Sequence, residues 1–232
     1  MRVYHDCPAD ALAAVAILCG RGYFAELAEL PAGALTARGS SDVRLWRVSP
    51  LLEEVMAQIS PTLPPGARVT DLGCGCGREA VWLALRGYSV NAVDVLPDAL
   101  AKAANLARRN GVKLNLIERD LGTGDLGEGV YDLVCLFRFL RRPLLSAIRR
   151  AVGAGGWVII ETFHQRDAGR PGRGRDTSKL LCDGELTAAF SGWKILLARD
   201  GVERDGRWLS QLVAQRGLGG ADEQINYPTG TR

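Results

Sequence analysis

Residues 71–77 read Asp-Leu-Gly-Cys-Gly-Cys-Gly, and this stretch decides the fold. A β-prone run, 68–72, precedes the glycines, and a segment with helical apolar spacing, 78–86, follows them. Glycines between a strand end and a helix start let the backbone turn tightly and approach a ligand closely. Asp94 follows the next predicted strand, 88–93, where a carboxylate can accept hydrogen bonds from both hydroxyls of a ribose. The stretch therefore predicts a strand–turn–helix unit that binds a ligand containing a nucleoside.

Strand and helix patterns alternate along the rest of the chain, which is typical of βαβ units and a parallel sheet. After residue 163 the rhythm changes, and two closing strands without a helix between them predict an antiparallel hairpin at the sheet edge. The predicted fold class is α/β, a Rossmann-like, doubly wound, mostly parallel seven-stranded sheet in a three-layer α/β/α arrangement. The further predicted strands are 113–118, 131–136, 156–163, 192–199 and 207–215, and the further helices are 97–109, 143–152 and 183–190.

Composition excludes several classes of protein. The chain has 232 residues, 47% of them hydrophobic, which is enough to bury a core of its own. A net charge of +3 is too small to indicate nucleic-acid binding, and no apolar run is long enough to span a bilayer. The start, residues 1–10, lacks the apolar region of a signal peptide. Six scattered cysteines are typical of reduced thiols, so we expect a cytoplasmic protein without a membrane partner.

The same glycine stretch distinguishes between nucleoside ligands. A dinucleotide fingerprint would need glycine at position 78, which holds Arg78, and the negative charge of Asp71 favours a cationic ligand over a pyrophosphate. The pattern Asp-x-Gly-x-Gly-x-Gly resembles motif I of the class I S-adenosylmethionine-dependent methyltransferases, and the resemblance covers residues 47–216. It implies S-adenosylmethionine as the cofactor and S-adenosylhomocysteine as the product. The one-residue spacing of Cys74 and Cys76 is not that of a zinc knuckle, and we expect no metal.

The resemblance implies roles for individual residues of the cofactor site. Asp71 and the backbone of the loop Gly73, Cys74, Gly75 and Gly77 would hold the methionine part, and Asp94 the ribose. Asp120 would face the adenine amino group, although the residue by itself could equally cap a turn. Val95 and Leu121 would sandwich the adenine ring, and Phe137 would line the site at the end of its strand.

The methyl acceptor is expected beyond the carboxyl ends of the strands, where residues 137–139, Glu161 and His164 form the natural walls. Arg138 lies between two aromatic residues, and we predict a contact with substrate or cofactor, with a structural ion pair as the alternative. His164 follows a strand end, so it is a candidate general base, with a solvated loop histidine as the alternative.

A narrower resemblance adds a domain boundary. Residues 137–144, 161–163, 169–171 and 184–186 resemble methyltransferases related to bacterial tellurite-resistance enzymes, some of which follow a rhodanese-like domain. Residues 1–31 resemble the tail half of such a domain, and a partial rhodanese-like segment would span 1–46. His5 stands where the persulfide-forming cysteine is expected, so we expect no sulfur transfer. The methyltransferase domain would span 47–216, and 217–232 would form a disordered tail.

Three functions are compatible with these features. The leading one is methyl transfer to a small-molecule S, O or metalloid acceptor. The arginine-rich loop 166–175 is either a mobile, solvated loop or a lid that attracts an anionic acceptor. An RNA- or protein-modifying methyltransferase would use this loop and the arginine doublets 108–109, 141–142 and 149–150. However, the loop has no interleaved aromatics for base stacking, which disfavours nucleic acid. A non-catalytic S-adenosylmethionine-binding scaffold is the third. The sequence does not indicate an oligomeric state.

Overall fold

The computed structural model describes residues 2–4, 12, 15–16, 26–28, 46–122, 125–168, 177–202 and 206–219. It divides the chain into two compact units, Met1–Leu45 and Trp46–Arg232. In the first unit, β1 (Arg2–Tyr4) pairs in parallel with β2 (Glu26–Ala28). Most of the rhodanese-like resemblance, including His5, lies outside the described residues, as do 220–232 of the predicted tail. Both predictions therefore stay predictions.

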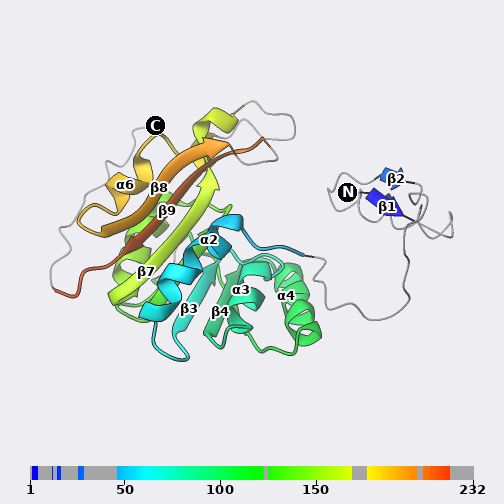
Figure 1. Cartoon of the computed structure of the whole chain (residues 1–232), viewed down its shortest axis with the longest axis horizontal. Coiled ribbons are helices and arrows are strands. Elements are labelled where there is room, and N and C mark those ends of the chain that lie inside the picture. The colour runs from blue at the N-terminus through cyan, green and yellow to red at the C-terminus, as the bar shows by residue number, and fades with distance from the viewer. Residues whose placement is uncertain are drawn as a thin grey trace. The chain divides into compact units, whose positions relative to one another are not determined.

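The second unit is built on a seven-stranded sheet with the order β5-β4-β3-β6-β7-β9-β8 (Figure 1). Neighbouring strands from β5 to β7 are parallel, whereas β9 is antiparallel to both β7 and β8. The predicted Rossmann-like sheet with a closing antiparallel hairpin is thereby confirmed. The strands are β3 (Arg68–Leu72), β4 (Ser89–Asp94), β5 (Asn115–Glu118), β6 (Tyr131–Phe137), β7 (Val152–Phe163), β8 (Lys194–Val202) and β9 (Trp208–Gln215).

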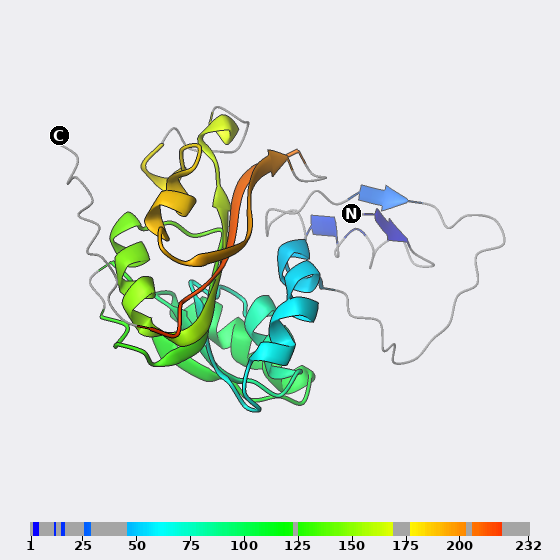
Figure 2. The same cartoon turned by 60° about the vertical axis from the view of Figure 1, so that its left-hand side comes forward.

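Helices cover both faces of this sheet. On one face lie α2 (Pro50–Ile59), α3 (Arg78–Ala84) and α4 (Pro97–Arg109). On the other lie α5 (Arg142–Ala151) and α6 (Glu185–Ala189), as the rotated view in Figure 2 shows. Short 3₁₀ turns complete the described elements: η1 (Ser60–Thr62), η2 (Gln165–Asp167) and η3 (Thr177–Lys179). Among the described residues, no helix is long and apolar enough to cross a membrane.

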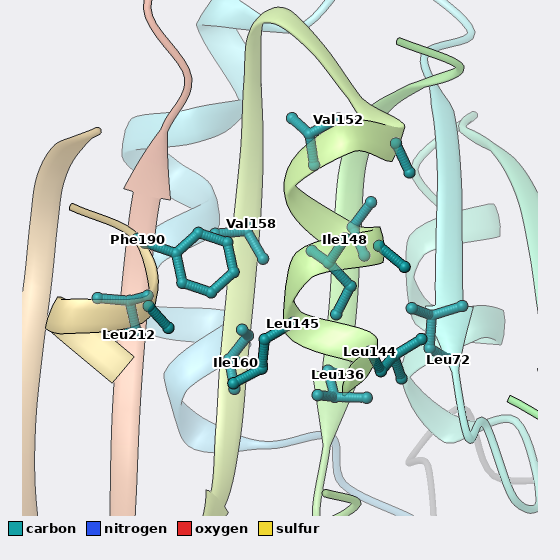
Figure 3. Close-up of a cluster of buried hydrophobic side chains, with 14 of the residues drawn as sticks. Leu72, Leu136, Leu144, Leu145, Ile148, Val152, Val158, Ile160, Phe190 and Leu212 are labelled. Atoms are coloured by element: carbon teal, nitrogen blue, oxygen red, sulfur yellow. The ribbon is translucent and has the colours of Figure 1, made fainter. Parts of the chain in front are cut away.

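Strand alternation divides the core between the two faces. Figure 3 shows Leu144, Leu145 and Ile148 of α5 lying against sheet residues such as Leu136 and Ile160. All five side chains are at most 2% exposed. A second cluster fills the opposite face beneath α2 and α3. The central strands are thus buried on both faces, which fixes their carboxyl ends as a rigid edge on which a site can be built.

Three details depart from the sequence-based elements. Helix α2 was not predicted, although Ser49 caps it by accepting the N–H of Leu51, and Pro50 begins it. Strand β7 begins at Val152 rather than at 156, because Gly153, Gly155 and Gly156 remain in the sheet instead of forming a turn. Strand β8 is displaced toward the C-terminus and ends at Val202 rather than 199.

Candidate active site

The glycine loop between β3 and α3 has a backbone that only glycine adopts easily. Gly73, Gly75 and Gly77 have φ angles of +70°, +52° and +76°, all in the left-handed region. A Cβ on Gly73 would lie 3.2 Å from the ring of Phe139, and a Cβ on Gly77 would lie 2.7 Å from Cβ of Ala103. The three glycines are therefore favoured by chain geometry, and Gly73 and Gly77 also by close packing, so that the loop presents bare backbone at the sheet edge.

The end of β4 fixes this loop in place. The Gly73 N–H donates to the Val93 carbonyl over 2.8 Å. The Asp94 carboxylate accepts the N–H of Gly75 at Oδ2 over 2.8 Å and the N–H of Leu96 at Oδ1 over 3.0 Å. Asp94 is 9% exposed. Because each carboxylate oxygen has two lone pairs, Asp94 can hold the loop and still accept hydrogen bonds from a diol.

Two buried carboxylates lie on the α3 side of the loop. Asp71 is 1% and Glu79 is 6% exposed. Among the described residues, Asp71 Oδ2 has no hydrogen-bond partner. Burial raises the pKa of Asp71 well above its ordinary 3.8, and the charges of Glu79 and Asp94 raise it further. The backbone N–H of Ala80 opposes this shift in pKa. A cation placed next to such a buried carboxyl group stabilises its ionised form.

The two cysteines of the loop differ in exposure: Cys74 is buried and Cys76 is exposed. Burial raises the pKa of the Cys74 thiol far above its ordinary value, and the charges of Asp71 and Asp94 add to the effect. Since the thiolate is the reactive form of cysteine, Cys74 contributes a neutral side chain to the loop and no nucleophile.

Arg138 follows β6 and faces the loop from the other side of the sheet's switch point. It has a φ of +57°, the one left-handed non-glycine residue of the described chain. Its Nη2 lies 3.6 Å from Oε1 of the fully buried Glu161, and its buried Nε has no hydrogen-bond partner among the described residues. Strained residues with incompletely satisfied polar groups are concentrated at functional sites. Phe137, 9% exposed, ends the strand just before it.

His164 is neither solvated nor available as a base. Its side chain is 0% exposed, Nδ1 accepts the Arg166 backbone N–H over 3.1 Å, and Nε2 lies 3.2 Å from Oδ1 of Asp183. With Nδ1 occupied as an acceptor, the neutral ring carries its proton on Nε2. No ring lone pair is left to remove a proton from an acceptor, so the geometry does not support the general-base prediction. The same tautomer keeps His164 from completing a metal site with Asp183 and Asp200, whose carboxylates lie close by.

Comparison with known proteins identifies this architecture. A family described as "Methyltransferase domain" matches residues 69–156. These residues contain the glycine loop, Asp71, Asp94 and Arg138. Residues 69–156 thus match a methyltransferase domain, and the unit has the class I S-adenosylmethionine-dependent methyltransferase fold.

Individual relatives of this chain carry different names. "Hemagglutinin 1" of Eikenella corrodens is 34% identical over 65% of this chain and 50% of its own. "Ubiquinone biosynthesis O-methyltransferase" of Rickettsia conorii is 38% identical over 42% of this chain and 35% of its own. The crystal structure of TehB from Haemophilus influenzae superposes with a TM-score of 0.60 and 18% identity, covering 75% of this chain and 63% of that one. The chain spans half or less of the two curated relatives, and the TehB likeness shows the fold.

The residues predicted to surround the adenine lie after the ends of β4 and β5. Val95 is 52% exposed next to Asp94, whereas Leu121 is 5% exposed. Asp120 accepts the N–H of Gly122 at Oδ1 over 2.8 Å and lies 4.0 Å from Arg141 Nη2. Asp120 therefore does cap a turn, which was the alternative to an adenine contact. Its half-exposed carboxylate has further lone pairs, so the adenine contact stays a prediction.

Sequence reasoning gave no site role to Ser49 or Glu79, and it named Glu161 only as a wall of the acceptor site. Ser49 donates its backbone N–H to Glu79 Oε1 over 3.1 Å and its hydroxyl to Glu161 Oε2 over 2.9 Å. The Ser-Pro pair that begins α2 is a helix-start signal that could have located Ser49. Glu79 was read only as part of a helix, and Glu161 only as a wall, because sequence periodicity does not show that the two approach the same serine.

One arginine in each of two doublets, Arg142 and Arg149, contributes to internal packing, whereas Arg141 and Arg150 are exposed. Arg142 pairs with Glu185 over 2.6 Å. The buried Arg149 donates to the carbonyls of Ala189 and Ser191. Both bind α5 to the segment around α6, so these charges are not presented to a nucleic acid. Residues 169–176, the greater part of the arginine-rich loop, lie outside the described chain.

Proposed function

We propose that this protein transfers the methyl group of S-adenosylmethionine to a small anionic acceptor. The proposal is supported above all by the unpartnered, buried oxygen of Asp71 beside the glycine loop. A sulfonium or ammonium group placed there would stabilise the ionised carboxylate. Asp94, fixed at the end of β4, is suited to the ribose hydroxyls of the same cofactor.

The surroundings of Arg138 support an anionic acceptor. Burial lowers the pKa of the Arg138 guanidinium, and Arg207 and Arg78 lower it further, while Glu161 raises it. The charges of Arg207 and Arg78 therefore act on the Arg138 guanidinium, and the charges of Glu161 and Glu79 oppose them. An acceptor that carries a carboxylate or another oxyanion group would stabilise these charges and would be held beside the cofactor by the Arg138 fork.

Alignment is the main chemical task of these residues. The cofactor supplies an activated methyl carbon, whose bond to sulfur breaks as the acceptor's lone pair attacks, leaving the electron pair on the thioether. The glycine loop, Asp71 and Asp94 would fix the direction of that bond, and Arg138 would bring the acceptor in line with it. Since His164 offers no free lone pair, we expect an acceptor atom, sulfur, oxygen or metalloid, that is already anionic at neutral pH.

The experiment is calorimetric titration with S-adenosylmethionine, S-adenosylhomocysteine and NAD, followed by turnover assays. We expect micromolar binding of the two adenosyl ligands and none of NAD. Asp94→Ala should weaken binding by about 1–3 kcal/mol. Asp98→Ala, an exposed aspartate in the first turn of α4, is the matched control and should change nothing.

The acceptor panel separates the remaining alternatives. Turnover with carboxylate, thiolate or inorganic oxyanion acceptors would support the proposal and name the acceptor atom. Binding without turnover across the panel would favour a non-catalytic scaffold, and salt-sensitive binding of RNA would favour an RNA-modifying enzyme. Absence of adenosyl-ligand binding would contradict the proposal as a whole.

A further inference from the structure

A row of polar side chains crosses the sheet on its α2 face and ends at Arg138. Arg199 on β8 is opposite Gln211 on β9, Gln211 is opposite Glu161 on β7, and Glu161 is opposite Phe137 on β6. Arg138 follows Phe137 directly, and its backbone N–H donates to the Glu161 carbonyl over 2.6 Å. The row thus runs across neighbouring strands from β8, at the edge of the sheet, to the end of β6, near its centre.

Side-chain hydrogen bonds join Arg199, Gln211 and Glu161 without a break. Gln211 Nε2 donates to Glu161 Oε2 over 2.8 Å, and Gln211 Oε1 accepts from Arg199 Nε over 2.6 Å. Arg199 in turn pairs with Glu54 of α2, with 2.7 Å between Nη2 and Oε2. Both ends of the Gln211 amide are used, so a flipped amide would place donor against donor and acceptor against acceptor. The amide orientation is therefore fixed by the surface pair.

The same arrangement orients the Glu161 carboxylate. Ser49 Oγ and Gln211 Nε2 both donate to Oε2, which directs Oε1 toward Arg138. The distance of 3.6 Å between Oε1 and Arg138 Nη2 exceeds that of a charge-assisted hydrogen bond. Glu161 therefore attracts the guanidinium without occupying its bidentate edge, and the Arg138 side chain keeps 27% of its surface exposed.

We propose that Glu161 is a positioning residue that holds the Arg138 guanidinium toward the methyl acceptor, with its own orientation set by Ser49 and by the row Gln211–Arg199–Glu54. The part that concerns the acceptor rests on the proposed function. The part that concerns the orientation of Arg138 does not, because it can be measured without any ligand.

Glu161→Gln is the primary test. The amide keeps the size of the side chain, and with its oxygen facing Ser49 and Gln211 it would place an NH₂ group against the guanidinium. We expect the Nε–H resonance of Arg138 in ligand-free protein, assigned with Arg138→Lys, to shift and to exchange faster with water. The acceptor KM should rise about tenfold while kcat and the Kd for S-adenosylhomocysteine change less than about threefold. Glu53→Gln, at an exposed position of α2, is the matched control and should match the wild type.

A double mutant separates positioning from a purely structural role. If Glu161 acts through Arg138, adding Glu161→Gln to Arg138→Ala should leave the acceptor KM where Arg138→Ala alone puts it. An equal rise in both backgrounds, or an unchanged Arg138 resonance in Glu161→Gln, would overturn the proposal. If the wild type turns over no acceptor, the proposed function fails, and the resonance alone still decides the orientation of Arg138.

Arg199→Met changes the row and leaves the buried carboxylate of Glu161 intact. The Arg199 side chain is 47% exposed at the sheet edge, so folding should be preserved. Loss of the Arg199 donor frees the Gln211 amide, and we expect a shift of the Arg138 resonance in the same direction as in Glu161→Gln but smaller. No shift in Arg199→Met would overturn the proposed row.

Discussion

At the scale of single residues, Asp71 combines a cost in stability with the cofactor-binding role proposed for it. Its pKa is raised by burial, so the folded protein holds the Asp71 proton more tightly than the unfolded chain does. The stability contributed by this group is complete below the ordinary pKa of 3.8 and is lost as pH rises through the raised value. A bound cation favours the ionised form and opposes this loss.

Asp71→Asn should therefore make the ligand-free protein less sensitive to pH above about 4 and more stable at neutral pH. It should weaken S-adenosylmethionine binding about tenfold, or ~1.4 kcal/mol, because the negative charge is gone. Thermal melts of both proteins between about pH 4 and 8 and calorimetric titrations test this. Parallel pH curves for the two proteins would show that Asp71 is not the group responsible.

Arg138 permits an equally specific test of backbone strain. A left-handed φ of +57° costs a residue with a side chain about 1–2 kcal/mol, and glycine avoids that cost. Arg138→Gly and Arg138→Ala both remove the guanidinium from Glu161, so their comparison isolates the backbone. We expect the glycine variant to be the more stable of the two by about 1 kcal/mol in urea unfolding, with both equally poor in acceptor binding. Greater stability of the alanine variant would contradict a strained backbone.

At the scale of elements, Gly77 fixes how α3 packs against α4. Gly77→Ala combines backbone strain with a Cβ 2.7 Å from Ala103 Cβ, whereas Gly66→Ala has similar strain, with φ +68°, and open space. We expect Gly66→Ala to lower the free energy of unfolding by about 1 kcal/mol and Gly77→Ala by at least ~2 kcal/mol. Ala103→Gly should recover part of the larger loss when combined with Gly77→Ala. Strictly additive effects in denaturant unfolding would rule out the clash.

Most strands and helices could be predicted from the sequence because each of their patterns depends only on neighbouring residues. The strand before Gly73 and the helix after Gly77 are short-range patterns, and the mostly parallel sheet was predicted from the alternation of such strands and helices. The partners of Glu161 could not be predicted in this way. Ser49 and Gln211 lie 112 and 50 residues away from Glu161 in sequence. Their contacts with Glu161 depend on strand register, which the periodicity of the sequence does not reveal. They also depend on α2, whose Ser-Pro start was not recognised in the sequence.

At the scale of the whole molecule, every site residue with a described position lies in the unit Trp46–Arg232. The segment 46–49 is part of that site, because Ser49 binds both Glu79 and Glu161. A fragment of residues 41–232 retains this segment and all the described site contacts. It should therefore bind S-adenosylhomocysteine with a Kd within about threefold of that of the full chain, a difference below ~0.7 kcal/mol.

Ser49→Ala in the fragment of residues 41–232 is compared with the unsubstituted fragment. It removes the cap of α2 and one donor to Glu161, and it should lower the free energy of unfolding by about 0.5–2 kcal/mol. Calorimetry and urea unfolding of the full chain, the fragment and the Ser49 variant measure both effects. If the fragment folds with normal cooperativity but loses the ligand, residues 1–40 contribute to the cofactor site directly, and the site would have to be extended into the first unit.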